Sequence, residues 1–186
     1  MENLGNFVRA YQTVTPLKLG ELWSIPIMLR LALIENIRRV SAHIAIDTVD
    51  RNLADYWAEK MIATTEKAPK NLILVIADMA RSNPPIVSAF VSELIRQLRG
   101  KGPDLALVLN WIEQQLSGSG LTSTELVNAE NQKLAADQVS MSNSIGSLRL
   151  LGALDWREFV ETHSIVEQTL LEDNEGTYGL MDFYYA

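Results

Sequence analysis

The sequence predicts an all-α protein: a bundle or array of several helices, with one long helix near the N-terminus and short Pro/Gly turns. Three observations lead to this fold class. Almost every segment repeats its apolar residues with the period of a helix, and no segment alternates convincingly with the period of two that strands show. Proline and glycine stand between the apolar runs, where helices begin and end. These patterns predict a fold class, and by themselves they predict no function.

The first expected helix has an apolar face at helical spacing, formed by Leu4, Phe7, Val8 and Tyr11. Proline favours the first position of a helix, so Pro26 predicts the start of the long helix. That helix is expected to reach about Glu66, either unbroken or as two helices divided near Thr48. Between residues 27 and 34 apolar residues surround the helix axis, which predicts that this stretch is buried on most sides.

Shorter helices are expected in the middle of the chain, each with an apolar face at helical spacing. Breaks at Ala68-Pro69, at Asn83-Pro84-Pro85 and at residues 100–103 separate them, and these connections are short enough for antiparallel packing. We treat residues 1–186 as a single all-α region. The Ser/Gly-rich residues 117–121 are a candidate hinge between helical subdomains.

The last third of the chain begins with a capping-box pattern at Thr122 and Glu125, which predicts a helix start. The helix that follows is markedly polar up to Asn143. Its apolar residues recur at intervals of seven, at Val127, Leu134, Met141 and Leu148. Such a narrow apolar stripe predicts a helix that is largely exposed, or that packs against something outside this chain. Asp155 predicts the N-cap of a further helix.

The composition bounds the class of protein. With 186 residues and 47% hydrophobic residues, the chain is long enough for a packed core. A net charge of -7 argues against nucleic acid and against anionic lipid as main partners. The absence of cysteine excludes disulfides and thiolate metal sites. No segment approaches the roughly 20 apolar residues that span a bilayer, so we expect a soluble piece without a direct membrane span.

A search for catalytic motifs finds none. The sequence contains no phosphate-binding loop, no G-x-G-x-x-G and no Asp-x-Asp. His43 and His163 stand outside any metal-binding motif; His43 and Asp47 lie one helical turn apart but would need further ligands. We therefore expect no catalytic, cofactor-binding or metal-binding residues, and no cofactor, in this chain.

Five residues are candidates for contact with a sugar or with another part of a longer polypeptide. They are Trp156, Asp155, Arg149, Arg38 and Arg39. Sugars stack on aromatic rings, and Trp156 has polar neighbours. The alternative for Trp156 is packing at a helix junction, where tryptophans commonly lie. The alternative for the arginines is a solvated or ion-paired side chain, since acidic residues outnumber basic ones.

Two blocks of the sequence resemble a known family. The first is FVRAYQTVTPLKLGELWSIPIMLRLALIENIRRV at residues 7–40, followed by DYWAE at residues 55–59. The second is SIGSLRLLGALDWREFVETHSIVEQTLLED at residues 144–173. Both resemble a non-catalytic region near the N-terminal end of the cyclic β-1,2-glucan synthases. These are very large glycosyltransferases of the bacterial inner membrane.

The resemblance implies a parent protein that polymerises glucose from UDP-glucose and cyclises the product. It implies that this chain is a non-catalytic helical accessory or scaffold segment on the cytoplasmic side of the inner membrane. The expected partner is the remainder of the parent polypeptide, with β-glucan as a further candidate. The alternative is a carbohydrate-binding module that guides the glucan chain. The aromatic ending at residues 183–186, without a polar cap, adds to the expectation of a fragment.

Overall fold

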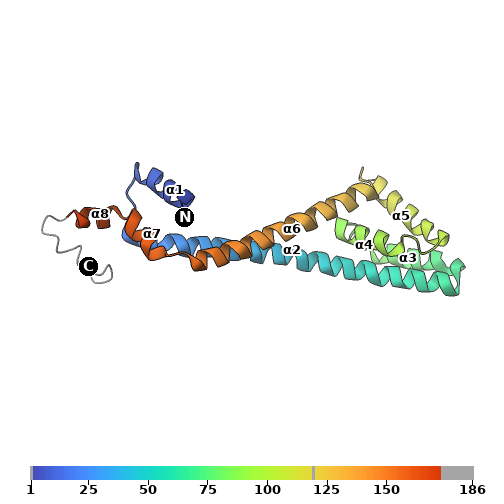
Figure 1. The fold of residues 1–186 in the computed structure, drawn as a ribbon. Coiled ribbons are helices and arrows are strands. Elements are labelled where there is room, and N and C mark those ends of the chain that lie inside the picture. Colours follow the sequence, from blue (N-terminus) through green and yellow to red (C-terminus); the bar gives the residue numbers. More distant parts are fainter. Residues whose placement is uncertain (1, 119, 173–186) are drawn as a thin grey trace. The chain divides into compact units, whose positions relative to one another are not determined.

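All regular structure in the described part of the chain is helical, which confirms the predicted fold class (Figure 1). The structure is a computed structural model, and it describes residues 2–118 and 120–172. The expected fragment ending at residues 183–186 lies outside the described residues.

Eight α-helices and two short 3-10 turns form within these ranges. In chain order they are α1 (Glu2–Gln12), α2 (Leu19–Lys67), η1 (Pro69–Asn71), α3 (Leu72–Ser82), α4 (Ser88–Leu98), η2 (Pro103–Leu105), α5 (Ala106–Ser117), α6 (Ser123–Ala153), α7 (Trp156–His163) and α8 (Ile165–Leu171). The expected breaks at Ala68-Pro69, Asn83-Pro84-Pro85 and residues 100–103 are confirmed. Asn83 ends α3 in the left-handed conformation, with φ 49°.

The chain divides into two compact units, which we call the first and the second unit. The first unit comprises Met1–Ile37 and Ser142–Ala186, and the second comprises Arg38–Met141. Helices α2 and α6 therefore contribute residues to both units. Residues 117–121, the candidate hinge, lie inside the second unit between α5 and α6.

The long helix is unbroken at Thr48, but the prediction that it begins at Pro26 is wrong. It begins at Leu19, and Pro26 lies inside it. The side chain of Glu21 accepts a hydrogen bond of 2.8 Å from the backbone N–H of Lys18, which satisfies one of the free donors at the helix start. The first turn is also anchored by Leu22, which is fully buried. These two interactions fix the helix start before the proline is reached.

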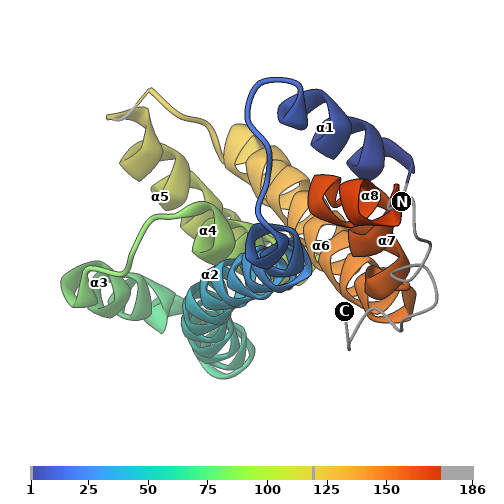
Figure 2. The same cartoon turned by 90° about the vertical axis from the view of Figure 1, so that its left-hand side faces the viewer.

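The core of the second unit is built by α3, α4 and α5 against the C-terminal half of α2 (Figures 1 and 2). Its largest fully buried side chains include Met61, Met79, Phe90, Leu94 and Ile112. Each of these helices supplies the apolar face that its sequence spacing predicts, so the second unit follows directly from the helical pattern.

Helices α2 and α6 meet through polar side chains, which we call the polar seam. In the second unit Arg51 donates to Glu130 at 2.7 Å, and Lys133 pairs with Asp47 at 2.6 Å. The Ser88 hydroxyl on α4 donates to the second oxygen of Glu130 at 2.9 Å, so both oxygens of this 2% exposed carboxylate have partners.

The polar seam continues in the first unit. There Asn36 donates to the Ser144 hydroxyl at 2.8 Å, and Arg30 donates to the Leu151 carbonyl at 2.9 Å. Most residues of α6 are exposed, as the polar sequence predicts, but this helix also packs on α2. Its inward face includes the buried Glu130 and Ser144, whereas Leu134 of the predicted apolar stripe is 41% exposed. The apolar residues of α6 do not predict this packing, because the contacts between α2 and α6 are largely polar.

We expect Glu130→Gln to lower the free energy of unfolding by about 1–3 kcal/mol, because Arg51 and Ser88 would lose the carboxylate that pairs with them. The loss should be smaller than for a fully buried ion pair, because the Arg51 side chain is 24% exposed. Urea denaturation at pH 7 measures the change. Glu66→Gln, at an exposed position of α2, is the control and should change stability by less than about 0.5 kcal/mol. Equal effects of both substitutions would contradict this assignment.

Candidate docking site on the first unit

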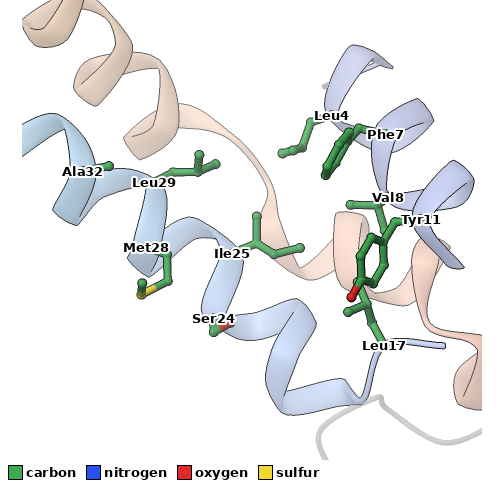
Figure 3. A pocket seen from close by; sticks show the side chains of 10 residues that line it. All are labelled: Leu4, Phe7, Val8, Tyr11, Leu17, Ser24, Ile25, Met28, Leu29 and Ala32. Atoms are coloured by element: carbon green, nitrogen blue, oxygen red, sulfur yellow. The ribbon is translucent and has the colours of Figure 1, made fainter. Parts of the chain in front are cut away.

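Helices α1 and α2 of the first unit leave an apolar groove between them (Figure 3). Its volume is about 540 Å³. The groove is lined by Leu4, Phe7, Val8, Tyr11, Leu17, Ser24, Ile25, Met28, Leu29 and Ala32. Only the hydroxyls of Tyr11 and Ser24 bring polar side-chain atoms to this lining, and the Ser24 hydroxyl already donates to the Glu21 carbonyl at 2.6 Å. The groove therefore suits an apolar occupant.

The groove arises because the apolar face of α1 is only partly used by the core. Val8 is 2% exposed and packs with residues of α2, α6 and α7, whereas Phe7 is 67% exposed. Figure 3 shows Leu4 and Phe7 directed from α1 towards α2, and Ile25 and Leu29 directed from α2 towards α1. The spacing of these residues predicts the two helices, but it does not predict the space between them.

A second apolar surface lies on α2, and we call it the open face. It consists of Ile27, Met28, Leu31 and Ile34, which are 62%, 59%, 56% and 54% exposed. The prediction that residues 27–34 are buried on most sides is therefore wrong. Met28 belongs both to the open face and to the groove, so the two form one apolar surface. Contiguous apolar surfaces of this kind mark interaction sites on proteins.

Helix α1 packs closely on α7 at Gly5 and is hydrogen-bonded to it through Gln12. A Cβ atom added at Gly5 would lie 2.7 Å from Nε2 of His163, so only glycine fits without movement. The His163 ring stacks on Phe159 with centroids 4.4 Å apart, and its Nδ1–H donates to the Phe159 carbonyl at 2.8 Å. Gln12 adds a hydrogen bond of 2.9 Å to the His163 carbonyl. His163 thus positions α1, which forms one wall of the groove. No local pattern in the sequence around His163 indicates this role.

The five predicted contact residues lie elsewhere. Trp156 is 8% exposed, and its Nε1–H donates to the Leu151 carbonyl at 2.8 Å. Asp155 caps α7 by accepting from the Glu158 backbone N–H at 3.0 Å, as its sequence position predicts. Arg149 is exposed on α6 of the first unit; Arg38 and Arg39 are exposed on α2 of the second unit, where each has a partner. None of the five lines the groove. Their contact with a sugar or with another polypeptide segment stays a prediction.

Residues 2–118 and 120–172 contain no group of three or more acidic or histidine side chains placed to hold a metal ion. Asp47, which lies one turn from the exposed His43, is paired with Lys133 in the polar seam. Within the same ranges no helix is both long and apolar enough to cross a membrane.

Asp55 and Glu93 form a carboxyl pair in the second unit, and carboxyl pairs can carry acid–base chemistry. Burial, and next a hydrogen bond with Glu93, raise the pKa of Asp55 above its ordinary value. A hydrogen bond from Arg96 lowers the pKa of Glu93. Gln97 donates to both carboxylates, at 2.7 Å to Asp55 and 2.9 Å to Glu93. With these hydrogen bonds formed between α2 and α4, we interpret the pair as a structural link.

Sequence comparison relates this all-α chain to a much larger protein. No family model matches the chain, and no solved structure matches it. The chain is 30% identical over 182 residues to the cyclic beta-(1,2)-glucan synthase NdvB of Rhizobium meliloti (strain 1021). The match covers 98% of this chain and 6% of the relative. The chain is thus related at the family level to the cyclic β-1,2-glucan synthases, as the resemblance predicts, and it spans a small part of their length.

We expect Gly5→Ala to lower the free energy of unfolding by about 1–3 kcal/mol, because the new methyl group overlaps His163 and α1 must move. Amide hydrogen exchange should show faster exchange in α1. Gly20→Ala is the matched control, because an added Cβ there meets nothing within 4 Å. This control should leave stability unchanged or raise it by up to about 1 kcal/mol. Unchanged exchange in α1 of Gly5→Ala would refute the close approach.

Asp55→Asn is expected to raise the free energy of unfolding at pH 7 by up to about 1 kcal/mol. A raised pKa means that the folded protein binds the Asp55 proton more tightly than the unfolded chain, so ionisation costs stability as pH rises. The amide carries no such cost. The gain should therefore disappear below pH 3.8, the ordinary pKa of the residue, when unfolding is followed by urea titration. Glu59→Gln, at an exposed position on the same helix, should show no comparable gain, and a loss of stability in Asp55→Asn would contradict the assignment.

Proposed function

We propose that this chain is a non-catalytic helical accessory segment of a bacterial cyclic β-1,2-glucan synthase. The observation that carries the proposal is the match over 98% of this chain to only 6% of the relative. We infer that a region of this kind serves the longer polypeptide by packing on, or positioning, its other parts. The apolar groove and the open face supply a surface for such packing.

The proposed parent uses UDP-glucose as donor and is a protein of the bacterial inner membrane, with this segment on the cytoplasmic side. The segment takes part in glucan synthesis without binding the donor. This assignment agrees with a sequence that has no phosphate-binding loop and no Asp-x-Asp motif. The remainder of the parent polypeptide is its proposed partner, and no cofactor is required.

The test has two arms. The purified chain incubated with UDP-glucose is expected to release no UDP, whereas removing the segment from the parent polypeptide is expected to abolish cyclic glucan formation. Measurable UDP release by the chain would make it an enzyme and overturn the proposal. Normal glucan formation after the removal would overturn it equally.

A carbohydrate-binding module is the second candidate function, and a polar pocket of the first unit favours it. The pocket lies between α1, α7 and α8 and has a volume of about 370 Å³. Its lining includes Arg9, Gln12, Thr162 and Gln168. Both side-chain amides of this lining already donate, Gln12 to the His163 carbonyl and Gln168 to the Thr162 carbonyl. Titration with β-1,2-gluco-oligosaccharides, followed by tryptophan fluorescence and calorimetry, decides the matter; no signal at millimolar sugar excludes this function.

A further inference from the structure

We infer that the groove and the open face together bind an apolar-faced helix supplied by the remainder of the longer polypeptide. This inference rests on the proposed function and names the surface and the kind of partner that it requires.

The open face has the geometry of a helix-packing surface. Ile27, Leu31 and Ile34 are spaced i, i+4 and i+7 on α2, so they form one row along the helix. Side chains in such a row pack between the side chains of a second helix. The polar seam engages α2 through Asn36, which lies on the opposite side of the helix from this row, and through Arg30, which flanks the row. A partner helix on the open face would therefore leave the Asn36 contact in place and would pack beside Arg30.

The chemistry of the groove selects an apolar partner over a sugar. A glucan carries many hydroxyl groups, and each one buried without a partner costs free energy. The groove offers the Tyr11 hydroxyl and a Ser24 hydroxyl that already donates to the Glu21 carbonyl. Apolar side chains entering beside Phe7 and Ile25 would instead gain from burial.

The relative supplies the reason to expect the partner on the same polypeptide. The match covers 6% of the related synthase, so nearly all of the synthase polypeptide lies outside the matched region. A partner segment on the same polypeptide acts at a high effective concentration, so a modest apolar surface is enough for stable docking. An anionic membrane surface is a poorer occupant, because it attracts basic segments and this chain has a net charge of -7.

The experiment uses the absence of cysteine from the natural chain. Leu31→Cys and, as control, Val49→Cys each create one attachment point for a photo-activated benzophenone cross-linker. Val49 lies on the same helix but in the second unit and is 66% exposed, so it matches Leu31 in type and exposure. The binding probe is the purified glucan-synthase polypeptide of the same organism from which the matching segment has been deleted. Circular dichroism confirms that each variant is folded.

The labelled Leu31→Cys chain is expected to cross-link to one helical peptide of the probe with an apolar face, and the labelled Val49→Cys chain to none. Leu31→Asp should weaken binding to the probe at least about tenfold, since a buried leucine side chain contributes that much or more, while Val49→Asp should change it less than twofold. Cross-links between two copies of the chain, attachment to vesicles containing anionic lipid, or equal labelling from both positions would each overturn the inference.

The outcome separates the inference from the proposed function. If the chain added in trans restores glucan formation to the probe, and Leu31→Asp restores it equally, the segment is an accessory part that docks elsewhere. In that case the inference fails and the proposed function stands. If the parent polypeptide forms glucan normally without the segment, the proposed function itself fails.

Discussion

The polar contact between α2 and α6 is the interaction on which the remaining packing depends. Residue numbers rise along α2 as they fall along α6 from pair to pair, so the two helices run antiparallel within each unit. Buried ion pairs add little stability compared with apolar contacts, but they are costly when mispaired. Glu130 illustrates this, because it meets Arg51 and Ser88 at once and finds both only in one register. We expect the seam to select the alignment of the helices more than to stabilise it.

Because the side of α2 that faces α6 is largely polar, many of the apolar residues of α2 lie on its other sides. In the second unit those between residues 53 and 62 pack against α3, α4 and α5, in a core that includes Met61 and Phe90. In the first unit the covering element is the shorter α1, attached at Gly5 and Gln12. It covers part of the apolar surface and leaves the groove and the open face. Within the first unit, the candidate docking site is thus the apolar part of α2 that neither α6 nor α1 covers.

The features that could be predicted from the sequence depend on neighbouring residues. The helix breaks follow from Pro and Gly; the Thr122–Glu125 capping box is confirmed by hydrogen bonds in both directions, and Asp155 caps α7 as expected. The exposure of residues 27–34 and the packing of polar α6 depend on helices distant in the sequence. The candidate site belongs to this second class. Its residues could be placed on helices, but the groove between them, and the approach of His163 to Gly5, required the structure.

The sharing of α2 and α6 between both units has a consequence for how such a segment evolves. A boundary at residues 37 and 142 would cut two helices in mid-length and leave unpaired backbone groups at each cut. Recombination at these points would therefore produce two pieces with frayed ends. Separate duplication, loss or exchange of one unit would therefore cost backbone hydrogen bonds, unlike that of an independent module. We expect the two units to be inherited as one piece.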